Sequence, residues 1–177
     1  METPDVLTGP GADASVRAAT AGDVPAIGAV HSRAWRTAYS GLLPAEVLKA
    51  LAPEALAEAW RPAVSAPPSP GHRVLVAAAG PTVVGFAAAE PDGEVVALLV
   101  DPAHQRRGHG SRLLNAVADL LREAGGERIG TWTPEQDAPR LAFLRTSGLE
   151  PDGRRRTLEL PGGATLEEVH LHAGLAS

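Results

Sequence analysis

The sequence predicts an α/β fold in which helices pack on the faces of a mixed β-sheet. Three patterns lead to this prediction: apolar residues at helical spacing near the N-terminus, β-branched strands in the middle of the chain, and strands alternating with helices after them. With 177 residues, 44% of them apolar, the chain can bury a substantial core in one domain. We expect residues 1–14 to form a flexible leader and residues 15–177 to form that domain.

The first part of the domain is predicted to be a short strand followed by a long helix. The strand is expected at 16–18, and Thr20 with Asp23 can cap a helix that runs to about Tyr39. Gly41 then ends the helix. One stripe of this helix is apolar and should face the core: Val24, Ile27, Val30, Ala34 and Ala38.

Two shorter helices and a loop should follow. One helix is expected after Pro44, and a second over residues 53–61, where Pro62 stops it. The Pro-rich segment 65–72 is too short to link two domains, so we interpret it as a surface loop.

The rest of the chain is predicted to complete the sheet. Residues 73–79 and 83–90 form a hairpin, residues 94–100 a third strand, and a long helix with an apolar face ends at Gly125. The later elements are a strand at 127–132, a helix at 139–147, and two strands that turn at 161–163.

Composition argues against several classes of protein. A net charge of −5 disfavours nucleic-acid binding, which depends on Lys and Arg at the phosphates. No apolar stretch approaches the roughly 20 residues that span a bilayer, and the N-terminus lacks the pattern of a secretory signal. The chain has no cysteine, and its histidines show no metal-ligand spacing. We therefore expect a cytoplasmic protein without nucleic-acid, membrane or metal partners.

The most informative segment lies between the third strand and the long helix. Residues 105–110 read Gln-Arg-Arg-Gly-His-Gly directly before that helix. The first N–H groups of a helix lack intrahelical acceptors, and the helix dipole is positive there, so the turn is typical of an anion-binding site. Gly108 and Gly110 allow a ligand to approach closely. Three arginines add positive charge: Arg106, Arg107 and Arg112.

Val100-Asp101-Pro102 followed by residues 105–110 resembles the acetyl-CoA signature, QxxGxG or RxxGxG, of the GCN5-related N-acetyltransferase (GNAT) superfamily. The resemblance covers roughly residues 15–172 and includes the order of the elements. It implies a mixed, mostly antiparallel sheet flanked by helices, as in a GNAT-like acyl-CoA acyltransferase fold, with acetyl-CoA as acyl donor. The residues implied to bind coenzyme A around the turn are Leu98, Leu99, Val100, Gln105, Arg106, Arg107, Gly108, His109, Gly110 and Ser111.

A second element, residues 137–149, is also similar to the family. Relatives usually carry Asn where this chain has Asp137, and often a Tyr, assigned as general acid, where it has Leu144. Asp137 could equally be the N-cap of its helix. Because a thiolate leaves without obligatory protonation near neutral pH, Leu144 predicts a reduced rate rather than inactivity. The resemblance places four residues of this element at coenzyme A: Asp137, Arg140, Phe143 and Leu144.

Residues 29–44 are similar to the first helix of a subgroup of these enzymes, which borders the acceptor cleft. The alternative is that its aromatic stripe only packs against the core. The residues expected at the acceptor are His31, Trp35, Tyr39 and Trp132.

The resemblance implies direct transfer of the acetyl group to an uncharged amine, in a ternary complex without an acyl-enzyme. A backbone N–H on the central strand, at Leu99 or Val100, would polarise the thioester carbonyl. An amine is mostly protonated at pH 7, so a base must remove its proton. Glu94 is the first candidate, and the alternative is a solvated turn residue. Weaker candidates are His31, Asp101 and His104.

We therefore expect an N-acetyltransferase that acts on an amine, with a small molecule favoured. Two alternatives stay open. One is an acyltransferase that uses another acyl group or a hydroxyl acceptor, and the other is a non-catalytic acyl-CoA-binding sensor, which Asp137 and Leu144 suggest. The final two strands offer an edge or face through which relatives often form homodimers.

Overall fold

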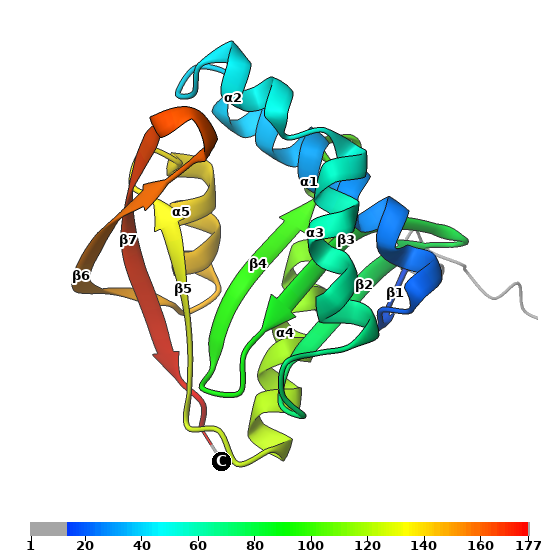
Figure 1. Ribbon diagram of the computed structural model, residues 1–177. Coiled ribbons are helices and arrows are strands. Elements are labelled where there is room, and N and C mark those ends of the chain that lie inside the picture. The colour runs from blue at the N-terminus through cyan, green and yellow to red at the C-terminus, as the bar shows by residue number, and fades with distance from the viewer. Residues whose placement is uncertain (1–13, 177) are drawn as a thin grey trace, which may run out of the picture.

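The computed structural model describes residues 14–176, and within them seven strands form one sheet in the order β1-β2-β3-β4-β5-β7-β6 (Figure 1). Only β4 and β5 run parallel, and every other neighbouring pair is antiparallel. The predicted mixed, mostly antiparallel α/β fold is therefore confirmed. The predicted leader lies outside the described residues except for Ala14, which begins β1. No helix in 14–176 is long and apolar enough to cross a membrane.

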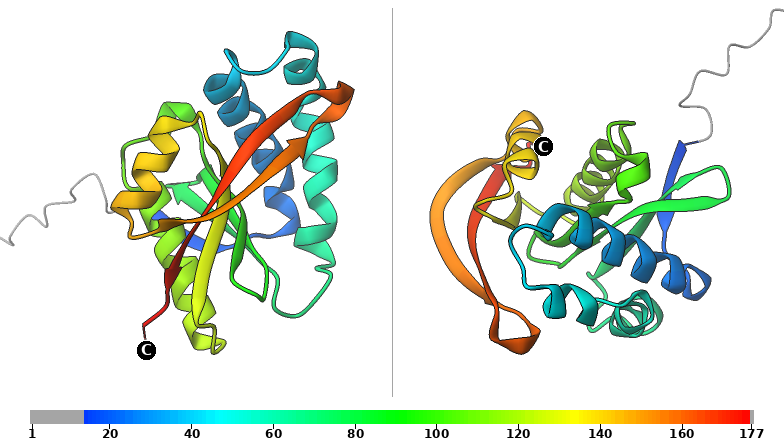
Figure 2. Two further views of the ribbon diagram at one scale, coloured as in Figure 1. Left: turned by 90° about the vertical axis from the view of Figure 1, so that its left-hand side faces the viewer. Right: turned by 90° about the horizontal axis from the view of Figure 1, so that it is seen from above.

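The helices cover both faces of the sheet. Helices α1 and α3 lie on one face, and α4 and α5 lie on the other (Figure 2). The strands are β1 (Ala14–Ala18), β2 (Arg73–Ala79), β3 (Thr82–Ala89), β4 (Glu94–Val100), β5 (Arg128–Pro134), β6 (Glu150–Glu159) and β7 (Thr165–Gly174). The helices are α1 (Val24–Tyr39), α2 (Ala45–Ala50), α3 (Pro53–Ser65), α4 (His109–Glu123) and α5 (Ala138–Thr146).

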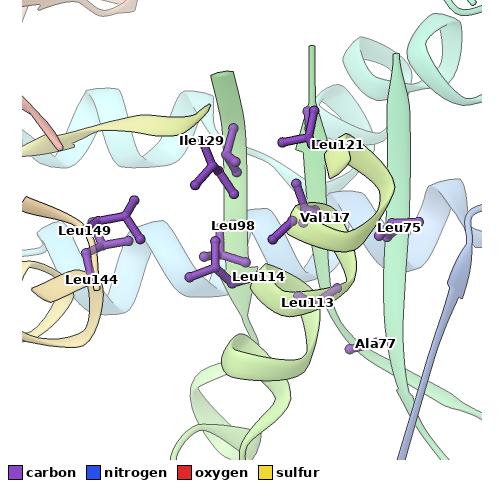
Figure 3. Close-up of a cluster of buried hydrophobic side chains, with 14 of the residues drawn as sticks. Leu75, Ala77, Leu98, Leu113, Leu114, Val117, Leu121, Ile129, Leu144 and Leu149 are labelled. Carbon is purple, nitrogen blue, oxygen red and sulfur yellow. The ribbon is translucent and has the colours of Figure 1, made fainter. Parts of the chain in front are cut away.

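Alternate residues of the central strands enter two separate cores, because successive side chains of a strand point to opposite faces. On the α4 face, Leu75 and Leu98 pack with the apolar stripe of that helix (Figure 3). On the α1 face, Phe86 packs with Ile27 and Val30. These two cores fix β4 and the start of α4 in place. The predicted stripe of α1 is buried apart from Ala38, because the last turn presents Tyr39 to the interior instead.

Helix α3 is longer than predicted. Pro62 does not stop it but lies inside it, and the helix continues to Ser65, after which the N–H of Ala66 donates to the Pro62 carbonyl. A proline removes one hydrogen bond, here to the carbonyl four residues earlier at Glu58. Glu58 is exposed, so water can take the place of the missing donor.

A 3-10 turn, Ala21–Asp23, leads into α1, and the predicted cap formed by Thr20 and Asp23 is a capping box on this turn. Asp23 accepts a hydrogen bond from the Thr20 N–H at 2.8 Å, and Arg17 donates to both of its carboxylate oxygens at 2.7 and 2.9 Å. The hydrogen bond from Arg17, above all, lowers the pKa of Asp23 from an ordinary value of 3.8 to about 2. The carboxylate therefore favours the folded state whenever the pH is above its pKa in the unfolded chain.

Asp23→Asn is expected to lower the free energy of unfolding by about 1 to 2 kcal/mol at neutral pH, less than the full pKa shift allows because Arg17 is half-exposed. The folded-state pKa of Asp23 is the lower one, so this stabilisation is lost as the pH falls from about 4 to about 2. Urea unfolding of both proteins at several pH values checks this. A difference that stays constant down to about pH 2 would contradict the assignment.

Candidate active site

Strands β4 and β5 are paired where they begin and separate towards their C-terminal ends (Figure 1). Their pairing comprises Glu94 with Gly130 and Val95 with Thr131, although β4 continues to Val100. Val96 is 55% exposed even though its strand lies in the middle of the sheet. A pocket of about 350 Å³ opens along this stretch of β4. The separation therefore leaves backbone groups of the central strand facing a pocket instead of a neighbouring strand.

This pocket gathers all three tryptophans of the chain and its one tyrosine. Helix α1 contributes His31, Trp35 and Tyr39 from one stripe, α3 contributes Trp60, and β5 contributes Trp132. The structure thus brings together all four residues predicted at the acceptor. Trp60 was not predicted, because only the packing of α3 against α1 brings it to the pocket.

Two of the four candidate bases line the pocket. Glu94 is one, and its side chain is 18% exposed. His31 is the other, but its Nδ1 accepts a hydrogen bond from the Trp60 indole at 3.0 Å, and burial lowers the pKa of His31 to about 4. His31 is therefore neutral at pH 7 and a poor proton acceptor. Among the described residues, Asp101 and His104 lie outside the pocket lining.

Asp101 has a different role, which is to hold the loop between β4 and α4. Its carboxylate accepts hydrogen bonds from the Ala103 N–H at 3.0 Å and from the Arg33 guanidinium on α1 at 2.9 and 2.5 Å. The side chain of Gln105 donates to the Val100 carbonyl at 3.3 Å. These contacts tie the predicted anion-binding turn to both α1 and β4.

The turn itself has the geometry of an anion site. Gly108 is the N-cap of α4 in the left-handed conformation, with φ 82°. The first N–H to bond within the helix is that of Arg112, which donates to the Gly108 carbonyl at 3.0 Å. The N–H groups of residues 109–111 precede it and have no intrahelical acceptor. His109 is 4% exposed, so its ring offers almost no surface to a ligand.

Positive charge surrounds these N–H groups. Arg106 and Arg107 are exposed on the turn, and Arg112 donates to the Arg107 carbonyl at 3.1 Å. A Cβ on Gly110 would lie 3.4 Å from the Phe143 ring, in van der Waals contact, so the glycine leaves this space beside the turn unfilled. Donors, charge and lack of side-chain bulk together fit a ligand with several phosphates.

The ends of β4 and β5 are separated by a gap. The turn before α4 lies at one edge of this gap, and the start of α5 lies at the other. Asp137 is the N-cap of this helix, which was one of the two roles predicted for it. Its carboxylate accepts hydrogen bonds from the Arg140 N–H at 3.2 Å and from the Tyr39 hydroxyl at 2.9 Å. Burial, and then the Asp137 carboxylate, raise the pKa of Tyr39 well above its usual value. The Arg140 guanidinium donates to the Leu98 carbonyl at 2.6 Å. Arg140 therefore joins α5 to β4 across the gap.

Leu144 requires a correction. It was predicted to contact coenzyme A, but its side chain is fully buried in the core that α4 and α5 share. An apolar side chain at this position gains more from the neighbouring leucines than from a polar surface. Leu144 therefore has no exposed surface to offer a ligand, whereas its neighbour Phe143 is only partly buried and lies next to Gly110.

Strands β6 and β7 close one side of the pocket with residues that the sequence analysis missed. Arg156 lies over the Trp132 ring, 4.5 Å from its centroid, and its Nε donates to Glu168 at 2.8 Å. Glu168 is 5% exposed, which makes this an ion pair with one buried partner. Such contacts depend on how β5, β6 and β7 are aligned, which the local sequence pattern does not indicate.

Comparisons with known proteins agree with this architecture. The chain is 42% identical over 84 residues to a mycothiol acetyltransferase of Brachybacterium faecium, a match that covers 47% of this chain but only 24% of that protein. It is 30% identical over 139 residues to YuaI, an uncharacterised N-acetyltransferase of Bacillus subtilis, covering 74% and 77% of the two chains. The fold resembles the PaiA N-acetyltransferase of Thermoplasma acidophilum, solved in complex with coenzyme A, with a TM-score of 0.72, 16% identity, and 91% and 98% of the chains covered.

Family membership follows from a match that spans both edges of the gap. Residues 33–149 match the acetyltransferase (GNAT) family, and this segment includes the C-terminal part of α1, the turn before α4 and all of α5. The chain therefore belongs to the GNAT acetyltransferase family.

Proposed function

We propose that this chain is an acetyl-CoA-dependent N-acetyltransferase that transfers the acetyl group directly to a small-molecule amine. The observation that carries the proposal is the separation of β4 from β5, which places the anion-binding start of α4 and the aromatic pocket against the same strand. A donor and an acceptor bound at these two places would meet at β4. This arrangement supports direct transfer in a ternary complex.

On the donor side, the N–H groups of residues 109–111 would hold the pyrophosphate, with the nearby arginines adding charge. The backbone of Leu98, Leu99 and Val100 would position the thioester arm, and a backbone N–H there would polarise its carbonyl. Arg140 keeps the Leu98 carbonyl and α5 together in this region. Asp137 and Phe143 remain proposed contacts, each at the α5 edge of the gap.

The chemistry begins with deprotonation of the acceptor. Glu94 would take a proton from the ammonium group, and the free amine nitrogen would attack the carbonyl carbon of the thioester. The new C–N bond forms as the C–S bond breaks, and coenzyme A leaves as a thiolate. The nitrogen, which becomes positively charged when it attacks, then loses its second proton to the departing thiolate or to water, which leaves a neutral amide. No general acid is required for that departure, because a free thiol has a pKa of about 8.5. The absence of a proton donor at Leu144 is compatible with this step.

The pocket favours an amine attached to an apolar body. Its aromatic walls provide apolar contact area and ring faces that attract a cation. The carboxylates of Glu90, Glu94 and Glu168 supply negative charge, although Arg156 offsets that of Glu168. A volume of about 350 Å³ suits a small molecule. These features support a small primary amine carrying an aromatic or alkyl group.

Calorimetric titration with acetyl-CoA and with free coenzyme A, together with thermal unfolding, tests the donor site. We expect one molecule to bind per chain and to raise the unfolding temperature, since a ligand that binds only the folded state stabilises it. Thiol release with a panel of alkyl and aryl amines, polyamines and lysine peptides then tests the acceptor. Failure to bind at millimolar acetyl-CoA would overturn the proposal. Binding without transfer to any amine would favour the acyl-CoA sensor instead.

A further inference from the structure

A cluster of titratable side chains lies behind Glu94, away from the pocket. His170 on β7 is 1% exposed, and its two ring nitrogens face two carboxylates. Its Nε2 lies 2.8 Å from Glu94 Oε1, and its Nδ1 lies 2.6 Å from Asp152 Oδ2 on β6. Of these three residues, only Glu94 lines the pocket. The buried ring can therefore exchange a proton with the pocket only through Glu94.

Besides the two carboxylates, one charged side chain and one aromatic ring lie against His170. The Nη2 atom of Arg154 lies 2.7 and 3.0 Å from the two ring nitrogens and 3.9 Å from Glu94. Its Nε lies 3.0 Å from Asp152. Trp132 packs against the imidazole with ring centroids 5.0 Å apart. Two carboxylates and one guanidinium thus face the ring, and their net charge is negative.

Gly130 makes the contact between His170 and Glu94 sterically feasible. A Cβ at this position would lie 2.8 Å from both Cε1 and Nε2 of His170 and 3.1 Å from Glu94 Oε1. Gly130 pairs with Glu94 across the parallel strands and with His172 across the antiparallel ones. Because any side chain here would push the ring away from the carboxylate, the glycine holds open the space in which the two groups meet.

The two contacts of the imidazole ring can each hold a proton. A hydrogen bond between a ring nitrogen and a carboxylate oxygen uses one proton, and the Nε2 of His170 lies 2.8 Å from Glu94 Oε1. With both contacts formed, Glu94, His170 and Asp152 hold two protons. If one of them is lost while the Nδ1 contact with Asp152 keeps its proton, Glu94 with Nε2 is left able to accept another. The cluster as a whole can therefore take up one proton from the pocket and release it again.

We propose that Glu94, His170 and Asp152 form a proton relay in which Glu94 and His170 share the proton removed from the acceptor amine. The inference rests on the proposed acetyl transfer. The N–H bond of the ammonium group breaks, its proton passes to Glu94 and is held between Glu94 and Nε2, and Asp152 stabilises the resulting imidazolium. The proton returns to water through Glu94 when the products leave. Glu94 is the catalytic residue, and His170 and Asp152 are positioning residues that act through it.

The test compares His170→Gln with His172→Gln, a matched change at an exposed histidine on the same strand. At saturating substrates, H170Q is expected to lower kcat about 10- to 100-fold, with little change in the KM for acetyl-CoA. The decrease of kcat at acidic pH should also begin at a lower pH in H170Q. A carboxylate alone binds a proton less readily than a carboxylate that shares the proton with an imidazole. H172Q should behave like the unmodified protein in both respects.

Asp152→Asn provides a second variant, since its side chain is not deeply buried and the amide oxygen can still accept from Nδ1. Loss of the negative charge should move the acidic fall of kcat in the same direction as in H170Q. If H170Q and D152N bind acetyl-CoA, unfold normally and keep both the rate and the pH profile, the relay is wrong while the proposed function stands. If the unmodified protein transfers no acetyl group to any amine, the proposed function itself fails.

Discussion

Gly110→Asp is expected to weaken acetyl-CoA binding at least about 100-fold and to leave the fold intact. Gly110 is at the second position of α4, where an acidic side chain favours the helix because it faces the positive end of the dipole. The same carboxylate would lie among the N–H groups that are proposed to hold the pyrophosphate. Two like charges about 4 Å apart near a protein surface repel by about 4 kcal/mol, which exceeds the free energy of a 100-fold change in affinity.

The control for this prediction is Gly110→Asn, which has the same size without the charge. A side chain here must fit beside Phe143, so some loss of affinity is expected from bulk alone. The difference between the two variants then measures repulsion. Calorimetric titration gives the affinity, and thermal unfolding without ligand checks the fold. If G110D binds acetyl-CoA as tightly as the unmodified protein, the pyrophosphate does not bind at this turn.

Much of the fold was predictable because it depends on local patterns. The apolar periodicity of α1 and α4 and the β-branched, apolar runs of β2 and β3 reflect which side chains must be buried, and the structure confirms the order of these elements. The turn at 105–110 was predictable for a similar reason, since a glycine N-cap in front of an amphipathic helix is itself a local signal. A role carried over from a family resemblance fails where the residue type differs. Leu144 was placed at coenzyme A because relatives often have a Tyr at this position, but as a leucine it lies in the core that α4 and α5 share.

Contacts between distant residues were the part that could not be predicted. Glu94 and His170 are 76 positions apart, and their contact depends on the register of both β4 with β5 and β5 with β7. Arg33 and Asp101 are 68 positions apart and meet because α1 packs beside the turn that follows β4. For Glu94 and His170, a shift of one residue in either strand register would point a side chain to the opposite face of the sheet. In the sequence, His170 is one of several residues at alternating positions of a strand, and nothing near it indicates that it contacts Glu94.

Glu94→Gln is expected to reduce kcat about 100-fold or more at neutral pH, with little change in the affinity for acetyl-CoA. The amide is similar in size to the carboxylate but binds no proton, so the acceptor amine would depend on water for its deprotonation. The effect should exceed that of H170Q, because Glu94 is the member of the relay that faces the pocket. Raising the pH should recover part of the activity, since more of the amine is then uncharged.

Two further variants separate this role from a general loss of negative charge. Glu94→Asp keeps the carboxylate but withdraws it from the pocket and from Nε2 of His170, so it should retain more activity than E94Q while falling short of the unmodified protein. Glu58→Gln removes a carboxylate on the exposed surface of α3 and should leave the rate unchanged. If E94Q transfers acetyl at the normal rate, deprotonation must occur elsewhere. His31 would not be the replacement, because its Nδ1 is already bonded to Trp60, so the proton would have to leave the amine through water.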